Sequence, residues 1–153
     1  HAYRLVGVPL RWILADTPLL DSSPIPYVWY IRLTKHDRFF VGICLEKVSK
    51  DNMFMPGRWD DPGHGYYIVR DDGWVWSSTD SELNDKRKYP FQHMKSGDLI
   101  KLAYNPSDSS LTVSPNSDSH FRLTVAAAPS GDVYRPCVFN SQTGDSAELV
   151  DMK

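Results

Sequence analysis

The stretch YYIVRDDGWVWS, residues 66–77, decides the fold of this chain. Its first part, YYIVR, and its last part, WVWS, are rich in aromatic and β-branched residues, as is typical of β-strands. Between them lies Asp71-Asp72-Gly73, and an Asp-Gly pair supplies the positive φ that a tight hairpin turn requires. The stretch therefore predicts a β-hairpin, with the two aspartates serving as turn residues.

Outward from this hairpin, the chain repeats the pattern of short apolar runs separated by turn residues. Residues 99–104 and 111–113 predict a second hairpin, joined by a polar loop. Residues 79–88 are polar and lack an apolar stripe at helical spacing, so we expect a loop or one turn there. Further strands are predicted at residues 27–33, 39–46, 121–126, 133–139 and 147–151. Many short strands with regular turns predict an all-β sandwich or barrel.

Length and charge limit the classes of function. The 153 residues fit one domain with one core. A net charge of -2, with no basic run longer than Lys86-Arg87-Lys88, argues against a nucleic-acid partner. No apolar stretch reaches the roughly 18 residues of a membrane span. The start, HAYR, lacks Met and a signal-peptide layout, so we read the chain as part of a longer multidomain protein.

Two cysteines, Cys44 and Cys137, lie far apart in the sequence, each inside an apolar run. Their separation is not the spacing of metal-ligand cysteines, and no cofactor is indicated. We expect buried free thiols, which suit a reducing compartment and hence the cytoplasm or nucleus. A disulfide between neighbouring strands is the alternative.

Five segments in order resemble the SPRY family, in its PRY-SPRY-like form. They are YVWYIRL (27–33) with FVGIC (40–44), the hairpin 66–77, GDLIKL (97–102) with LTV (111–113), YRPCVFN (134–140), and SQTGDSAEL (141–149). Three departures mark a divergent member: residues 105–110 carry no glycine, Tyr66-Tyr67 replaces the usual tryptophan, and the first thirty residues do not match the PRY extension.

The resemblance covers residues 27–151 and implies a bent two-sheet antiparallel β-sandwich of the SPRY, concanavalin-like jelly-roll type. It implies no enzymatic activity. Family members bind peptides or protein surfaces through loops at one end of the sandwich, and many serve in the substrate receptors of ubiquitin ligases. We therefore expect residues 27–153 to form the domain. Residues 1–26 should form an N-terminal arm and connection that packs on it.

The predicted partner-binding site consists of two loops. Residues 52–64 place Met, Phe, Arg and Trp in a loop marked by Pro and Gly, and these types are enriched at protein interfaces. Residues 140–144 are small and polar, and their amides suit a peptide backbone; the resemblance places them beside the first loop. The predicted residues are Met53, Phe54, Arg58, Trp59, Asp60, His64, Asn140, Ser141 and Gln142. The alternatives are that Phe54 and Trp59 cap the core and that the second loop is merely solvated.

Catalytic patterns are absent from the sequence. The five histidines are scattered, and there is no Gly-x-Ser-x-Gly elbow or phosphate-binding loop. Asp60, Asp61 and His64 leave open a lectin-like domain that binds carbohydrate or calcium. A structural domain within a large assembly is a third possibility. Trp74 and Trp76 share one side of their strand, and we expect one or both in the core.

Overall fold

The computed structural model describes residues 2–6, 12–35, 39–52, 63–80, 82–84, 86–87, 94–95, 97–116, 119–140 and 146–150. Sheet A has the order β1 (Ala2–Val6), β12 (Ser146–Val150), β3 (Tyr27–Lys35), β8 (Leu99–Asn105), β9 (Ser110–Asn116) and β10 (Ser119–Thr124). Sheet B has the order β2 (Trp12–Leu14), β11 (Tyr134–Asn140), β4 (Phe39–Leu45), β5 (Tyr66–Arg70), β6 (Trp74–Ser77) and β7 (Lys86–Arg87). One short helix, α1 (Glu46–Asp51), follows β4. No described helix is long and apolar enough to cross a membrane.

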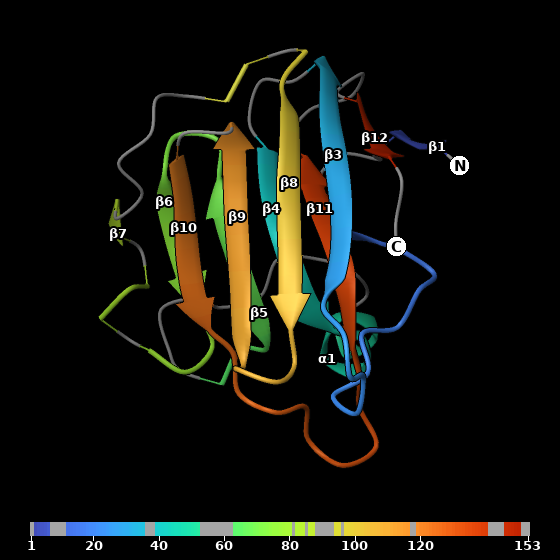
Figure 1. The fold of residues 1–153 in the computed structure, drawn as a ribbon, viewed down its shortest axis with the longest axis vertical. Helices are drawn as coiled ribbons and strands as arrows, with labels where there is room; N and C mark the ends of the chain where they lie inside the picture. The colour runs from blue at the N-terminus through green and yellow to red at the C-terminus, as the bar shows by residue number, and fades with distance from the viewer. Residues whose placement is uncertain are drawn as a thin grey trace.

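The two sheets lie face to face, with sheet A in front of sheet B in Figure 1. Every pair between described strands is antiparallel, so the predicted two-sheet antiparallel sandwich is confirmed. The predicted hairpin is β5–β6: Gly73 has φ 92° and its N–H donates to the Arg70 carbonyl at 2.9 Å. The predicted strand 39–46 ends one residue early because Glu46 begins α1, a helix of six residues that the sequence did not reveal.

The core lies between the sheets and follows from alternation along each strand. In β8, Ile100, Leu102 and Tyr104 are buried, whereas Leu99 and Lys101 are exposed. Side chains of one parity therefore face sheet B, as expected for a sheet with one solvated face. Sheet B supplies the other half of the core. Its contributions include Val41, Ile43 and Leu45 of β4, Tyr67 and Val69 of β5, Val75 of β6, and Tyr134 and Val138 of β11.

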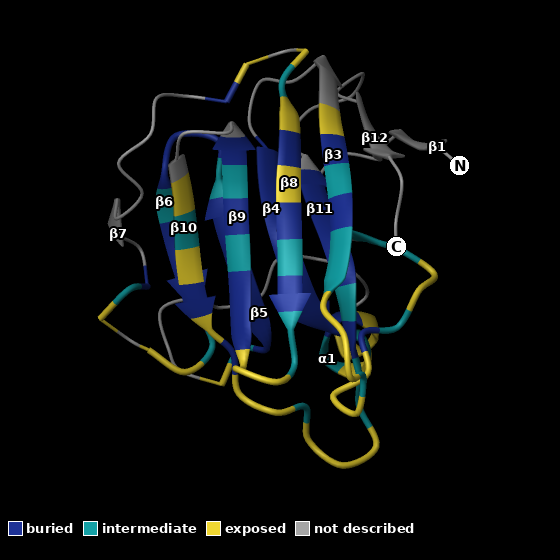
Figure 2. Ribbon diagram, viewed as in Figure 1, coloured by how far each residue is buried: buried dark blue, intermediate teal, exposed yellow. Residues whose placement is uncertain are grey.

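Strands β4 and β5 are buried on both faces, as their dark blue ribbons in Figure 2 show. The face of sheet B that points away from sheet A carries a second apolar cluster, which we call the outer cluster. It consists of Phe40, Cys44, Tyr66, Ile68, Trp76, Cys137 and Phe139. The near-continuous apolar sequences FFVGICL and YYIV are explained by this burial on two sides.

The two cysteines are buried free thiols in the outer cluster, as predicted. Cys44 pairs with Arg135 and Cys137 pairs with Gly42, so the thiols lie on neighbouring strands, offset by two residues. Burial, followed by the contact with Cys44, raises the pKa of Cys137. The thiol form is therefore favoured at neutral pH.

The N-terminal segment adds one strand to each sheet, since β1 pairs with β12 and β2 pairs with β11. The connection that follows is fixed by Asp21, whose Oδ1 accepts a hydrogen bond from Tyr104 Oη at 2.8 Å. Its Oδ2 accepts one from the Ala128 N–H at 3.1 Å. The Leu20 N–H also donates to Tyr27 Oη at 3.2 Å. One carboxylate thus joins the connection to β8 and to the segment before β11.

We expect Asp21→Ala to lower the free energy of unfolding by about 1–3 kcal/mol, because it leaves the buried Tyr104 hydroxyl and the Ala128 N–H without their acceptor. Urea unfolding measures this loss. The exposed neighbour Ser22→Ala is the control, with an expected change within about 0.5 kcal/mol. Equal midpoints for the two variants would show that the Asp21 carboxylate does not stabilise the connection.

Candidate functional site

A cluster of arginine and aromatic side chains, the types enriched at protein interfaces, lies at one end of the outer cluster, where the β5–β6 hairpin turns. Arg70, Trp74 and Trp76 share the outward parity of the hairpin. Phe40 on β4 lies opposite Arg70 on β5 and, on its other side, opposite Phe139 on β11. The sheet order β11-β4-β5-β6 therefore brings a guanidinium and four aromatic rings together.

Arg70 is held among these rings by charge and by geometry. Its guanidinium carbon lies 5.1 Å from the Trp74 ring centre, 5.6 Å from that of Trp76 and 6.0 Å from that of Phe40. Such cation–π contacts are attractive, most of all over tryptophan. Asp72 accepts two hydrogen bonds of 2.7 Å each, from Nε and Nη2 of Arg70. This two-point pairing fixes the plane of the guanidinium.

The rings themselves form a packed row. The Phe40 ring centre lies 5.5 Å from that of Trp76 and 5.4 Å from that of Phe139, and Trp74 stacks on Trp76 at 6.5 Å. Trp76 and Phe40 are only 4% and 6% exposed, whereas Trp74 and Arg70 are partly exposed. The two tryptophans therefore join the outer cluster instead of the core between the sheets. Trp74 and Arg70 form the accessible part, which we call the Arg70–Trp74 patch.

The predicted site residues are only partly described. Met53, Phe54, Arg58, Trp59, Asp60, Ser141 and Gln142 lie outside the described residues, as does Asp61 of the calcium alternative. Asn140 is the last residue of β11, paired with Phe39, and only its backbone is described.

His64 is half-buried and makes internal hydrogen bonds. Its Nδ1 accepts from the Tyr66 N–H at 3.1 Å, and its Nε2 lies 3.2 Å from Asn84 Oδ1. The neutral tautomer with the proton on Nε2 satisfies both contacts. His64 thus ties the start of β5 to the segment before β7.

The described ends of the two predicted loops lie far apart. Gly65, next to His64, accepts a hydrogen bond from the Leu45 N–H, at the end of β4. Asn140 pairs with Phe39, at the start of β4. At about 3.3 Å per residue, these ends are roughly 20 Å apart along the strand. The Arg70–Trp74 patch lies at the Asn140 end, because Phe139 and Phe40 belong to its row.

The sequence did not identify Arg70, Phe40 and Phe139 as site residues. The available signal was an arginine and two tryptophans of the same parity around a hairpin turn, at residues 70, 74 and 76. The turn aspartates act as predicted: Asp71 Oδ1 accepts from the Phe39 N–H at 3.3 Å, and Asp72 holds Arg70. Among the described residues, no group of three or more His, Cys, Asp or Glu side chains could hold a metal ion.

No protein-family model and no curated protein matches the chain. Among solved structures, the SPRY domain of human HERC1 superposes with a TM-score of 0.69 at 14% identity, covering 98% of this chain and 94% of that one. The chain has the SPRY-domain fold. The PSpry domain of TRIM65 gives a TM-score of 0.58 at 13% identity, over 94% of this chain and 72% of that chain. The carbohydrate recognition domain of Emp47p is also similar, with a TM-score of 0.44 at 14% identity, over 92% and 74% of the two chains.

Proposed function

We propose that this domain is a non-catalytic protein-interaction module that binds a peptide or protein at the end of the SPRY fold where the β5–β6 hairpin turns. The observation that carries the proposal is the Arg70–Trp74 patch. Trp, Tyr and Arg dominate the binding energy of protein interfaces, and they do so where neighbouring side chains hold them rigid. Arg70 is already fixed by Asp72 and the rings, so binding would cost little side-chain entropy.

The proposal includes the two loops predicted from the sequence. Asn140 follows Phe139 of the aromatic row at the end of β11, and the proposed contacts include Asn140 with the next two residues of the sequence, Ser141 and Gln142. Met53, Phe54, Arg58, Trp59, Asp60 and His64 belong to the loop that ends at the other end of β4, so in this proposal they supply a second, separate set of contacts to a partner that spans roughly 20 Å. We further propose that the module recruits substrates within a longer chain, such as a ubiquitin ligase. Its place would be the cytoplasm or nucleus, where the two buried thiols stay reduced, with neither nucleic acid nor membrane as partner.

Trp74→Ala is expected to abolish capture of the partner. Affinity capture from cell lysate with wild type and variant, read by mass spectrometry, identifies the proteins lost. The affinity of the purified partner should fall at least about tenfold, because truncating a central tryptophan removes about 2 kcal/mol or more. Trp59→Ala, measured in parallel, tests the first predicted loop.

The matched control is Arg122→Ala, an exposed arginine on β10 of sheet A whose pairing with Asp108 lies on the surface. It should capture the same proteins as wild type. Thermal midpoints of all variants show that the fold is retained. If Trp74→Ala and Trp59→Ala both retain the wild-type set of partners, the proposed surface is wrong.

A further inference from the structure

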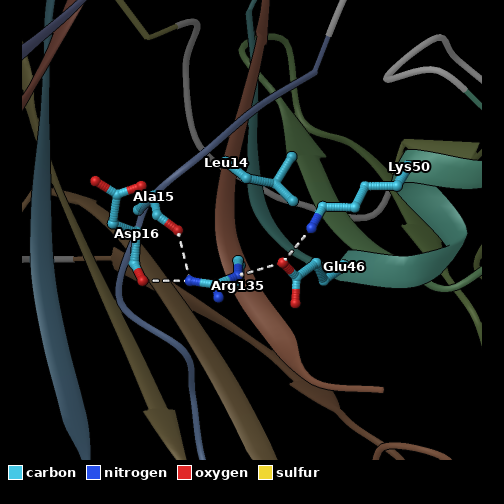
Figure 3. Close-up of a pocket in the computed structure, with 6 residues that line it drawn as sticks. All are labelled: Leu14, Ala15, Asp16, Glu46, Lys50 and Arg135. Atoms are coloured by element: carbon cyan, nitrogen blue, oxygen red, sulfur yellow. Dashed lines mark hydrogen bonds and ion pairs between the residues drawn. The ribbon is translucent and has the colours of Figure 1, made fainter. Parts of the chain in front are cut away.

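A second site lies on the same face of sheet B, at the opposite end from the Arg70–Trp74 patch. It is a pocket of about 290 Å³ between β2, β11 and α1 (Figure 3). Its lining residues are Leu14, Ala15, Asp16, Glu46, Lys50 and Arg135. None of these takes part in the Arg70–Trp74 patch, so variants at the two sites report on them separately.

A proline in β11 determines how the pocket is built. The Ala15 N–H donates to the Pro136 carbonyl at 2.9 Å, which makes these two residues a hydrogen-bonded pair of the antiparallel ladder. The return bond to the Ala15 carbonyl would need an N–H at residue 136, and proline has none. The guanidinium of Arg135 supplies the missing donor: its Nη1 donates to the Ala15 carbonyl at 3.3 Å and also to the Asp16 carbonyl.

Three charged side chains of the pocket contact one another and together carry a positive charge. Glu46 lies between two cations, 2.8 Å from Lys50 Nζ and 3.3 Å from Arg135 Nε. The hydrogen bond from Lys50, more than any other contact, lowers the pKa of Glu46, so its carboxylate is ionised at neutral pH. The group of Glu46, Lys50 and Arg135 carries a charge of about +1, and Asp16, the fourth charged lining residue, brings the formal charge of the whole lining to zero. Figure 3 shows the Asp16 carboxylate turned away from the guanidinium.

Donors remain for an incoming anion. Arg135 uses Nη1 and Nε in the contacts above, and Nη2 has no hydrogen bond to the part of the chain that the structure describes. Lys50 Nζ makes one bond of the three it can donate, and its side chain is 58% exposed. A second carboxylate, bound between Arg135 Nη2 and Lys50 Nζ, would alternate with the two cations as Glu46 does.

The pocket borders the edge of sheet B, as far as the described strands define it. β2 is an outermost strand of sheet B, and no described strand pairs with its free side. Hydrogen-bonded pairs alternate, so Ala15 and Ile13 direct their backbone groups to β11. Leu14, between them, directs its N–H and C=O away from the sheet. Its side chain packs on the outer cluster, so Leu14 and Arg135 share one face.

We propose that an extended acidic peptide adds to β2, pairs with the backbone of Leu14, and places a Glu or Asp side chain between Lys50 and Arg135. Strand addition to a free edge supplies affinity through the main chain, and a pocket beside the edge supplies specificity. The peptide residue opposite Leu14 projects its side chain to the same face as Leu14, which is the face of the pocket. The two cations select an acidic residue at this position.

The test uses the full ¹⁵N-labelled chain, acetyl-Thr-Val-Glu-Val-Thr-amide, and the same peptide with Gln in place of Glu. We expect the amide signals of Leu14 and Ala15 to shift during titration, with roughly tenfold weaker binding of the Gln peptide. Lys50→Gln should reduce the preference for Glu. Absence of shifts at millimolar peptide, or equal binding of the two peptides, would overturn the proposal.

The main-chain contact has its own matched pair of variants. Leu14→Pro removes the outward N–H without removing a bond to β11, whereas Leu14→Ala truncates the side chain and keeps the N–H. Binding should be lost only in the proline variant; equal affinities overturn the proposal. A Glu peptide methylated on its central nitrogen repeats the test from the ligand side if Leu14→Pro fails to fold. Inorganic phosphate that matches the Glu peptide's affinity without shifting the Leu14 amide would show an anion site alone, which also overturns it.

Discussion

Gly42→Ala is expected to prevent folding of the domain. A Cβ at residue 42 would lie 2.0 Å from the Tyr67 carbonyl oxygen, 2.9 Å from Ile68 Cα and 3.0 Å from Ile68 Cγ2. Two of these atoms are backbone of the neighbouring strand, so no side-chain rotation relieves the overlap. β4 is central in sheet B and buried on both faces, and a shift of it would disturb both clusters. We expect a loss above about 4 kcal/mol, close to the whole stability of a small domain.

The measurement is urea unfolding of purified protein, with soluble yield as a first indication. Gly131→Ala is the control, because Gly131 has φ 85° and open space around it. The substitution there costs only the strain of a positive φ, about 1 kcal/mol. Similar midpoints for Gly42→Ala and Gly131→Ala would contradict the expected overlap, because they would show that β4 and β5 can separate without loss.

Stability is expected to fall steeply above about pH 10. Tyr66, Tyr104 and Tyr134 are at most 2% exposed, and burial above all raises the pKa of each hydroxyl above its ordinary value of 10.0. The unfolded chain therefore releases these protons at a lower pH than the folded chain. The stabilisation from these hydroxyls is fully present below the pKa of tyrosine in the unfolded chain. It is lost as the pH rises towards their pKa in the folded chain. Each tyrosine then removes up to about 1.4 kcal/mol per pH unit.

Denaturant unfolding over a series of pH values, with tyrosinate absorbance recorded in parallel, measures this slope. Tyr66→Phe keeps the ring and removes one titrating group, so its slope above pH 10 should be shallower than that of the wild type. The comparison is Ser22→Ala at an exposed position, which removes no titrating group and should leave the slope unchanged. Equal slopes for wild type and Tyr66→Phe would contradict the burial argument.

Local chemistry explains which parts of the structure could be predicted from the sequence. The hairpin 66–77 required only a turn with a positive φ at Gly73 and two β-prone flanks, and both are visible in the residues. The helix α1 is shorter than two turns, so no apolar periodicity could develop along it.

The candidate sites depend on register between distant strands. Arg70 meets Phe40 and Phe139 only because β4 lies between β5 and β11 with this register. The pocket depends on the alignment of Ala15 with Pro136, and nothing in the local sequence around either residue specifies that partner. The sequence therefore predicts the strands, but it does not predict the row of side chains that β11, β4, β5 and β6 form together.

The pairing of β1 with β12 has a mechanical consequence. Ala2 is the register partner of Val150, so the first and last described strands meet at their outer ends, where Figure 1 places the two termini on one side of the molecule. A force that pulls the two ends of the chain apart would load this ladder from Ala2 and Val150 inward. The hydrogen bonds would then break one pair after another, as in unzipping, and not all at once, as in shear. Tension on the chain would therefore detach β1 first, at low force, while both candidate binding sites on sheet B remain intact.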